Sequence, residues 1–395
     1  MQNFEFYSPT EIIFGKGSEE QTGKQIIKHG GSRVFVVHGS SVVKTGALDR
    51  IIETLKAEGL EYELCGGITP NPRLSFAREA VKKAITFNTD FVLAIGGGSV
   101  IDTAKAVADG VANPETDIWE FWTEAVKLTK ALPVGVVLTL SASGSETSNS
   151  AVLTNEETGQ KIGFNLDLHR PQFAIMNPEF TFTLPKYQIG CGVADIMMHT
   201  LDRYFTITKD NDMTDGIAEA LLKNVIKHGR TAINNPSDYV AASELMWAGS
   251  LSHNGITGLG AVTDFAPHQL GHEVSAWFDV AHGASLTAIW GAWATYTYPT
   301  DVARFAQYGR NVWGITEGSD EDIALAAIDA TVDYFRFLEM PVSFSEVAEI
   351  GSTVGDEVLN EFADRITRYG KRPFVGGFKK LYRDDAYEIY QMSNK

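Results

Sequence analysis

The chain has 395 residues, which is long for a single hydrophobic core, so two domains are expected. Its composition, 44% hydrophobic and 21% charged, is typical of a globular protein, and no apolar run reaches the ~20 residues of a membrane span. A formal charge of −17 without a basic run argues against nucleic acid or an anionic membrane as a partner.

The first half of the chain alternates strand-like and helix-like segments. The strand-like segments are apolar without polar alternation, which is typical of parallel strands covered on both faces. We expect strands at residues 33–38, 62–65, 91–95 and 134–138, and helices at residues 46–59, 75–87 and 100–111. This alternation predicts a doubly wound, Rossmann-like α/β domain.

After Pro185 the pattern changes, and no convincing strand follows. Helical patterning covers residues 187–205, 213–233, 239–255, 268–274 and 323–338. We therefore expect an α/β domain at residues 1–184 and an all-α domain at residues 185–395.

A glycine-rich turn follows the strand expected at residues 91–95. Gly96, Gly97 and Gly98 allow positive φ angles and close backbone approach, and Ser99 can cap the next helix. The free amides and the dipole of a helix N-terminus attract phosphate. Three consecutive glycines exceed the need of an ordinary turn, so we predict a phosphate-binding loop, although it is not the G-x-G-x-x-G fingerprint.

A second polar run, residues 139–148, follows the strand expected at residues 134–138. At the carboxyl end of a parallel strand beside the glycine loop, its hydroxyls can bond to sugar and pyrophosphate oxygens. Taken alone, it is equally an ordinary serine-rich loop with a helix cap.

Side chains of metal-binding type cluster in the second half of the chain. Asp195 and His199 are four residues apart in a helical segment, which places both on one face. His268 and His272 repeat this spacing, and His282 follows in a turn. We interpret the other five histidines as packed core residues, but two such pairs plus a further histidine predict a divalent-metal site. Imidazole and carboxylate ligands without thiolate suit Fe²⁺, Zn²⁺, Mn²⁺ or Co²⁺.

Together these residues resemble the iron-containing (group III) alcohol dehydrogenase family, and within it the NADPH-dependent butanol dehydrogenase and aldehyde reductase branch. The resemblance spans roughly residues 5–300 and implies an architecture like that of dehydroquinate synthase. The matching motifs are Phe14-Gly15-Lys16-Gly17, Gly96-Gly97-Gly98-Ser99-x-x-Asp102, the run from Thr139 to Glu146, Asn177-Pro178, Asp195-x-x-x-His199, and His268-x-x-x-His272 with His282.

The resemblance also implies roles for individual residues. In that family, the residues matching Asp195, His199, His268 and His282 bind the metal, and the residue matching His272 lies beside the nicotinamide and transfers a proton. The implied cofactor-binding set is Gly97, Gly98 and Ser99 at the pyrophosphate, Asp102 in the same motif, Thr139 and Ser143 along the cofactor cleft, and Lys161 near the cofactor.

The residue after the strand at 33–38 bears on the choice of cofactor. NAD-using relatives carry an aspartate there that bonds the adenosine ribose, whereas this chain has Gly39, followed by Ser40 and Ser41. Without a carboxylate, nothing repels a 2′-phosphate, and the two hydroxyls can donate to it. We therefore expect NADP(H), bound in part by Gly39, Ser40 and Ser41.

We expect an NADP(H)-dependent enzyme that interconverts aldehydes and primary alcohols at one divalent ion, Fe²⁺ by resemblance and Zn²⁺ equally acceptable by chemistry. The alternatives are a glycerol dehydrogenase-like polyol oxidoreductase, a metallohydrolase and a non-catalytic nucleotide-binding protein. The family suggests a homodimer, with residues 4–7 as a strand that crosses between subunits. Two distant cysteines and the lack of a signal-peptide pattern predict a cytoplasmic location.

Overall fold

The computed structural model describes all residues, Met1–Lys395, and the chain divides into two compact units. The α/β unit comprises Tyr7–Thr183 and Ser237–Ser250. The helical unit comprises Met1–Phe6, Leu184–Pro236 and Leu251–Lys395. The domains expected at residues 1–184 and 185–395 remain a prediction, and nothing in the sequence pattern indicated that residues 237–250 pack with the α/β unit.

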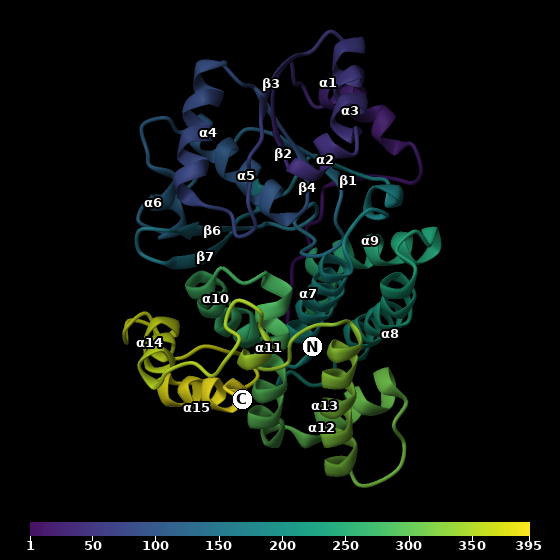
Figure 1. Cartoon of the computed structure of the whole chain (residues 1–395), viewed down its shortest axis with the longest axis vertical. Helices are drawn as coiled ribbons and strands as arrows, with labels where there is room; N and C mark the ends of the chain where they lie inside the picture. The colour runs from purple at the N-terminus through teal and green to yellow at the C-terminus, as the bar shows by residue number, and fades with distance from the viewer. The chain divides into compact units, whose positions relative to one another are not determined.

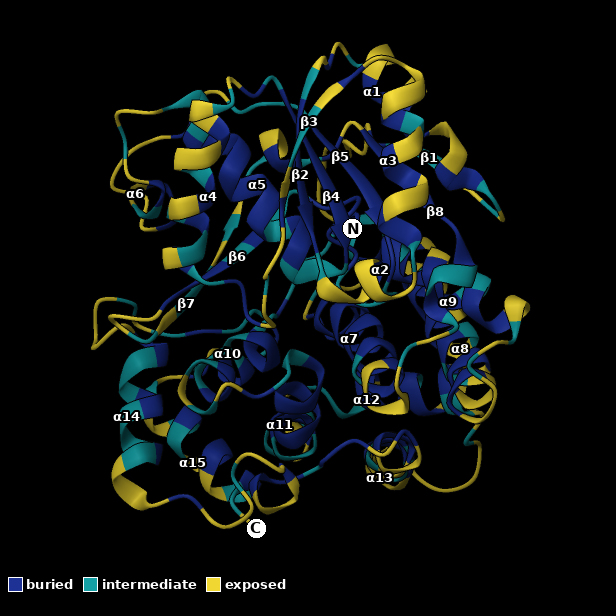
Figure 2. Cartoon of the chain, turned by 45° about the horizontal axis from the view of Figure 1, so that its top comes forward, coloured by how far each residue is buried: buried dark blue, intermediate teal, exposed yellow.

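A six-stranded parallel sheet forms the centre of the α/β unit (Figure 1). Its strand order is β1-β8-β5-β4-β2-β3, and every neighbouring pair is parallel. The central strands are buried along their whole length (Figure 2), which explains why their sequences show no polar alternation. The strands are β1 (Glu11–Phe14), β2 (Arg33–His38), β3 (Glu61–Cys65), β4 (Phe91–Gly96), β5 (Val134–Leu138) and β8 (Phe173–Met176).

Helices cover both faces of this sheet. Val34 and Val36 of β2 pack in one layer with α1 and α3, while Phe35 and Val37 pack in the opposite layer with α4 and α5. The predicted doubly wound, Rossmann-like arrangement is therefore confirmed. The helices of this unit are α1 (Thr22–Lys28), α2 (Ser40–Lys44), α3 (Ala47–Ala57), α4 (Leu74–Thr86), α5 (Gly98–Ala112) and α6 (Ile118–Trp122).

Four strands were not predicted from the sequence: β1, β8, and the two strands of an antiparallel hairpin, β6 (Ser150–Asn155) and β7 (Gln160–Asn165). The hairpin packs against α6 in a separate apolar cluster that includes Trp122, Leu153 and Phe164. Trp122 also donates a hydrogen bond to the carbonyl of Ala151, 3.2 Å away. The hairpin thereby attaches to the rest of the α/β unit.

The helical unit contains no strand, as predicted. Its helices pack mainly side by side: α11 lies against α7, α10, α13 and α15, and α14 lies against α10 and α15 (Figure 1). Residues of α9 up to Ser250 belong to the α/β unit. Apart from α9 (Tyr239–His253), the helices of this unit are α7 (Lys186–Tyr204), α8 (Asp212–Asn234), α10 (Ala266–Phe278), α11 (His282–Thr297), α12 (Val302–Tyr308), α13 (Asp320–Phe337), α14 (Asp356–Ile366) and α15 (Arg383–Ser393).

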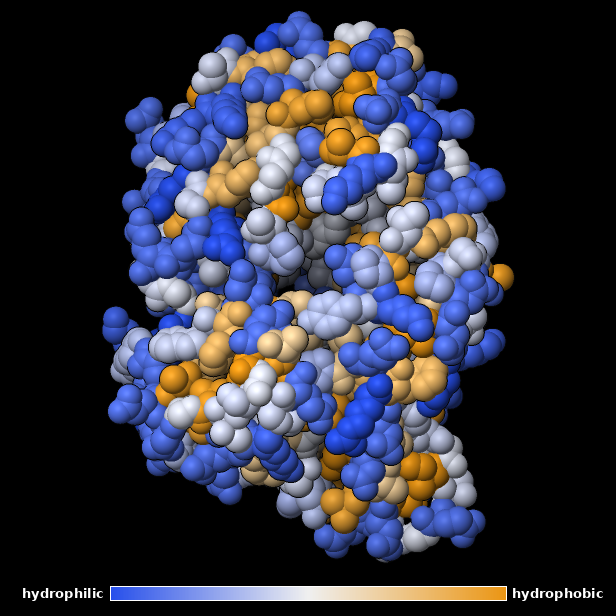
Figure 3. Space-filling view, in the orientation of Figure 1, coloured by the Kyte–Doolittle hydropathy of each residue, from blue (hydrophilic) through white to orange (hydrophobic).

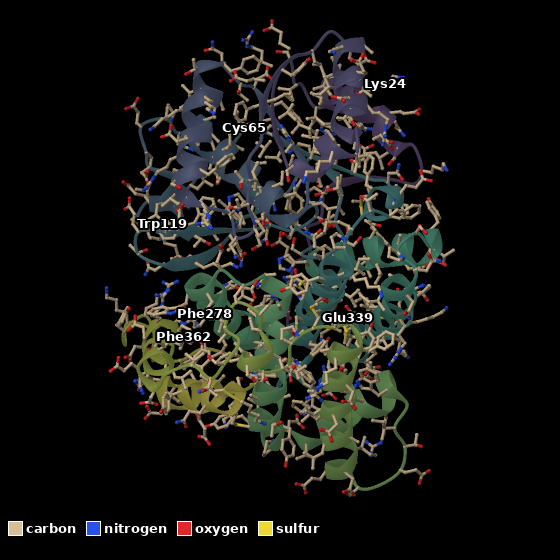
Figure 4. All side chains as sticks on the ribbon, in the orientation of Figure 1. Lys24, Cys65, Trp119, Phe278, Glu339 and Phe362 are labelled. Carbon is tan, nitrogen blue, oxygen red and sulfur yellow. The ribbon has the colours of Figure 1, made fainter.

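The contact between α10 and α14 is aromatic. Phe278 and Phe362, both labelled in Figure 4, have ring centroids 6.2 Å apart and meet edge to face. Trp277 meets the same Phe362 ring at 5.7 Å, and the Arg365 guanidinium lies over Trp277. These contacts hold the C-terminal end of α10 in place.

The turn expected at His282 is wrong, because His282 is the first residue of α11. That helix is apolar around most of its circumference, so it shows no helical period in the sequence. On the visible face of the molecule, hydrophilic side chains predominate (Figure 3), in keeping with 50 acidic and 33 basic residues. None of the helices combines the length and apolar character that crossing a membrane requires.

Candidate metal centre and cofactor loops

Asp195 and His199 lie on the buried face of α7, one helical turn apart. Their side chains are each only 6% exposed. His199 Nδ1 lies 3.0 Å from the backbone oxygen of Asp195 and 3.2 Å from Asp195 Oδ1. The i, i+4 spacing therefore brings the two side chains together, as expected from their positions on one helix face.

His268 and His282 approach the same carboxylate from α10 and α11. His268 Nε2 and His282 Nε2 each lie 3.7 Å from Asp195 Oδ1. One ligand-type atom from each of Asp195, His268 and His282 falls within 4.8 Å of the other two. Ligands at about 2.1 Å in a tetrahedral site are about 3.4 Å from one another, so these separations suit a single ion. His199 is adjacent, with its ring centroid 4.4 Å from that of His268, but it is not one of these three residues.

Two atoms of the cluster show that a cation fits there. Asp195 Oδ1 and His268 Nε2 are buried and have no hydrogen-bond partner. A buried polar atom left without a partner costs about 1–3 kcal/mol, and buried charges are usually paired or coordinate metals. A divalent ion between these atoms would satisfy both.

The surroundings of the cluster give its imidazoles different proton affinities. Burial, reinforced by His253 and His268, holds the pKa of His199 well below its ordinary value, which favours the neutral ring. Burial lowers the pKa of His268 as well, but Asp202 and Asp195 outweigh it and raise that pKa to about 9. A divalent ion would compete with a proton for His268.

Three residues beside the predicted ligands were not singled out in the sequence. Asp202 Oδ2 lies 2.6 Å from His268 Nδ1. Arg203 donates to the carbonyls of His199 and Ser252 and to His253 Nδ1. The ring of His253 lies 4.0 Å from that of His199, so our interpretation of His253 as an ordinary core residue left out this contact. Asp202 had a sequence signal, because it follows Asp195 by seven residues, or about two turns.

His272 borders the cluster without contributing to it. It lies one turn after His268 on α10, and its ring centroid is 5.2 Å from that of His282 and 6.4 Å from that of His268. It is half-buried, and its nitrogens are not among the three ligand-type atoms that converge.

The predicted cofactor-binding residues lie in the α/β unit, mostly at the carboxyl ends of β2, β4 and β5. The chain passes from β2 to β3 on one side and then returns to place β4 on the other side of β2. Such a reversal of strand order is where dinucleotides bind in open α/β sheets. Gly39 follows β2, Gly97 follows β4 and Thr139 follows β5, so all three meet near this point.

The glycine loop differs from expectation in two details. None of Gly96, Gly97 and Gly98 has a positive φ angle; instead, a Cβ on Gly96 or Gly98 would lie 2.5 Å from Val100 Cγ2 or Ser143 Oγ, respectively. Glycine is therefore needed at Gly96 and Gly98 because the neighbouring side chains pack closely against the backbone. Ser99 is not the cap, because Gly97 is the N-cap of α5 and offers no side chain to its amides. The first turn of α5 is therefore left open to an anion.

The loop that contains Ser143 is held by two charged side chains of α5. Asp102 accepts hydrogen bonds from Ser145 Oγ at 2.6 Å and from the Val152 amide at 3.0 Å. Lys105, 1% exposed, donates to the carbonyls of Ser145, Ser148 and Ser150 and to Ser145 Oγ, at 2.7–3.2 Å. Asp102 thus braces the loop, and its carboxylate oxygens already have protein donors.

Two further predicted positions have distinct surroundings. Gly39 has extended backbone and is followed by the exposed Ser40 and Ser41 at the start of α2. Lys161, on β7, donates to Asn71 Oδ1 at 2.8 Å, so it is more than an exposed surface lysine.

Two family models match the chain and establish its family membership. The model described as iron-containing alcohol dehydrogenase matches residues 9–178, and the model of the C-terminal part of the same family matches residues 190–393. The chain belongs to the iron-containing alcohol dehydrogenase family. It is accordingly an oxidoreductase of the alcohol dehydrogenase and aldehyde reductase class, which acts with a nicotinamide cofactor.

Several characterised proteins resemble the chain over nearly its whole length. NADH-dependent butanol dehydrogenase A of Clostridium acetobutylicum is 38% identical over all of both chains, and the NADPH-dependent aldehyde reductase YqhD of Escherichia coli is 37% identical over 90% of this chain and 91% of its own. The crystal structure of NADH-dependent butanol dehydrogenase A from Thermotoga maritima superposes with a TM-score of 0.95 at 34% identity, covering 100% of this chain and 99% of that one.

Proposed function

We propose that the protein catalyses reversible NADP(H)-dependent hydride transfer between aldehydes and primary alcohols at one divalent ion, as a butanol dehydrogenase-like enzyme. The observation that carries this proposal is the buried cluster of Asp195, His268 and His282, with two partnerless polar atoms, in a member of this family. The ion is Fe²⁺ by family, although the donor set accepts Zn²⁺ equally.

The proposed metal ligands are Asp195, His199, His268 and His282. A bound divalent ion supplies Lewis-acid polarisation of the substrate carbonyl, and the nicotinamide supplies the hydride. Asp195 offers the single carboxylate, which leaves such a site with a net positive charge. His199 joins the set through Nε2, since its Nδ1 already faces the Asp195 carbonyl.

His272 is the proposed proton-transfer residue. It borders the ligand cluster and is half-buried, so its side chain is in reach of both the site and water. His272 lies one turn after His268 on α10, so the helix fixes the distance between His272 and that proposed ligand.

The proposed cofactor set is Gly97, Gly98 and Ser99 for the pyrophosphate, Thr139, Ser143 and Lys161 along the dinucleotide, and Gly39, Ser40 and Ser41 for a 2′-phosphate; Asp102 acts by holding the Ser143 loop. The relatives named above use either NADH or NADPH, so the preference for NADP(H) depends on the absence of a carboxylate at Gly39. The uncapped first turn of α5 supports the pyrophosphate assignment.

Assembly and location are also proposals. We propose that residues 1–184 bind the dinucleotide and that residues 185–395 carry the metal site. The exposed side chains of Phe4, Phe6 and Tyr7 and the edge position of β1 support a homodimer that pairs through this region. Both cysteines are free, as expected of a cytoplasmic protein.

Oxidation of NADPH with butanal, followed at 340 nm, tests the function. We expect turnover by protein loaded with Fe²⁺ or Zn²⁺, loss of turnover after chelation, and recovery when the ion is returned. Oxidation of glycerol without any aldehyde reduction would indicate a polyol enzyme instead. Metal-dependent ester or amide hydrolysis without any use of cofactor would indicate a hydrolase.

Two alanine variants separate the metal ligands from the proton-transfer residue. We expect His268→Ala to lose both bound metal and activity. His272→Ala is expected to keep its metal and to lose about 10²–10⁴-fold in kcat, the usual contribution of general acid–base catalysis. Metal analysis of both purified variants, beside their rates, checks this. Equal loss of metal in the two would make His272 a ligand.

A further inference from the structure

Asp202 lies behind the ligand cluster on α7. It follows Asp195 by seven residues, so both carboxylates project from the same side of the helix. Its side chain is fully buried, at 0% exposed, and its Oδ2 lies 2.6 Å from His268 Nδ1. Its other oxygen, Oδ1, has no hydrogen-bond partner, so His268 is the one group to which this carboxylate bonds.

This contact determines which nitrogen of His268 is available to an ion. A carboxylate can only accept a hydrogen bond, so the proton must sit on Nδ1. When the ring is neutral, as it must be to bind a metal, the lone pair is then left on Nε2, the atom that lies 3.7 Å from Asp195 Oδ1. Residues that hold a metal-binding histidine in this way fix both its ring orientation and its tautomer, and they raise its basicity as a ligand.

We propose that Asp202 is the positioning residue of His268, holding Nε2 toward the metal and strengthening its affinity for the ion. This inference rests on the proposed metal site. Asp202 itself is not a ligand, because its Oδ2 contacts the opposite side of the His268 ring from the converging ligand atoms.

The backbone around Asp202 is held by a second carboxylate. The Asp264 amide donates to the Asp202 carbonyl at 2.7 Å, which ties the segment before α10 to α7. The Asp264 side chain accepts from the amides of Gly377 and Phe378, both at 2.8 Å, and from that of Ala266 at 3.2 Å. The start of α10 is thereby fixed between α7 and the C-terminal loop.

The same segment leaves little freedom to His268. Phe265, the N-cap of α10, has a φ of 59°, and Pro267 occupies the first turn. A Cβ on Gly377 would clash with the Thr263 carbonyl, so the C-terminal loop also packs tightly here. The backbone at the start of α10 therefore holds His268 beside Asp202, and their contact does not depend on a choice among several rotamers.

The test is the affinity of the metal-free full-length protein for Zn²⁺, measured by competition with a chromophoric chelator. Asp202→Asn keeps the size of the side chain but removes its charge and permits the wrong tautomer of His268. We expect the Kd for Zn²⁺ to rise about 10–100-fold, the usual cost of losing such a partner. In the metal-free wild type, ¹⁵N-edited spectra are expected to show a strongly deshielded proton on His268 Nδ1 that is absent from the variant.

Asp215→Asn is the matched control, because Asp215 is also a buried carboxylate of this unit but pairs with Arg304. We expect it to bind Zn²⁺ as tightly as the wild type. A wild-type Kd in Asp202→Asn overturns the inference, whereas a wild type that binds no divalent ion overturns the proposed function as well. If Asp202→Asn does not fold, Asp202→Glu displaces the carboxylate while keeping its charge, and wild-type affinity in that variant likewise contradicts the role.

Discussion

The proposed preference for NADP(H) over NAD(H) depends on Gly39. Its φ and ψ of −76° and 163° are open to any residue, and a Cβ there would meet Val100 Cγ2 at an ordinary 3.6 Å. Gly39→Asp therefore introduces a carboxylate without strain. We expect the ratio of kcat/KM for NADPH to that for NADH to fall at least about tenfold, or 1.4 kcal/mol, through repulsion of the 2′-phosphate.

Gly39→Asn is the control for this substitution, because it adds the same volume without charge. Steady-state rates with both cofactors and butanal measure the effect. An equal fall in the two variants would attribute it to crowding, and no change in either would remove Gly39 from the cofactor site.

Sequence spacing singled out the residues of the candidate metal site, but not the residues that lie behind them. The i, i+4 spacing is visible in the sequence and places both members of a pair on one helix face. It singled out Asp195 with His199 and His268 with His272. Asp202 had a weaker signal, because it is a further acidic side chain that follows Asp195 by seven residues. Asp264 had none, since its partners Gly377 and Phe378 are more than 100 residues away in sequence. Contacts of that kind are set by the tertiary fold alone.

Apolar runs identified the buried strands β2, β4 and β5, whereas several other strands were missed. β1 and β8 have only four residues each, and β7 is largely exposed, so none offered a sustained pattern. α11 was missed for the opposite reason, since a helix that is apolar on nearly all sides has no period. The strands that were found include those buried on both faces, whose apolar runs are unbroken.

The element that supports the proposed cofactor loops is α5, and its Lys105 gives a test by pH. Burial lowers the pKa of Lys105 from 10.5 to about 8, against the opposing pull of Asp102 and Glu146. Between these two pH values the unfolded chain binds more protons than the folded one, so this residue makes the free energy of unfolding rise with pH. The full shift corresponds to about 3 kcal/mol.

Lys105→Met removes this group while keeping its length. We expect the melting temperature of the wild type, relative to that of Lys105→Met, to increase from pH 8 toward pH 10.5, as measured by circular dichroism at several pH values. Melting curves that shift in parallel would mean that Lys105 titrates normally and that the carbonyls around it do not depend on its charge.

At the scale of the whole molecule, the charge of −17 opposes an anionic cofactor. In the proposed binding mode attraction is local, from the amides at the start of α5 and the hydroxyls near β2 and β5. Salt screens the repulsion between the negatively charged protein and the anionic cofactor. We therefore expect moderate salt to weaken cofactor binding less here than it would for a basic protein.

The metal gives the last prediction, because all its proposed ligands come from the helical unit. An ion that binds only the folded state stabilises it by about 2.7 kcal/mol when its free concentration is 100 times its Kd. For a unit of about 200 residues, this raises the melting temperature by roughly 5–10 °C. Calorimetry of the full chain with excess Zn²⁺ and with chelator is expected to show this difference in the transition of the helical unit. His268→Ala is expected to melt at one temperature in both conditions. If the wild type also melts at the same temperature with Zn²⁺ and with chelator, the Asp195 cluster binds no ion. Its buried atoms without hydrogen-bond partners would then need another explanation.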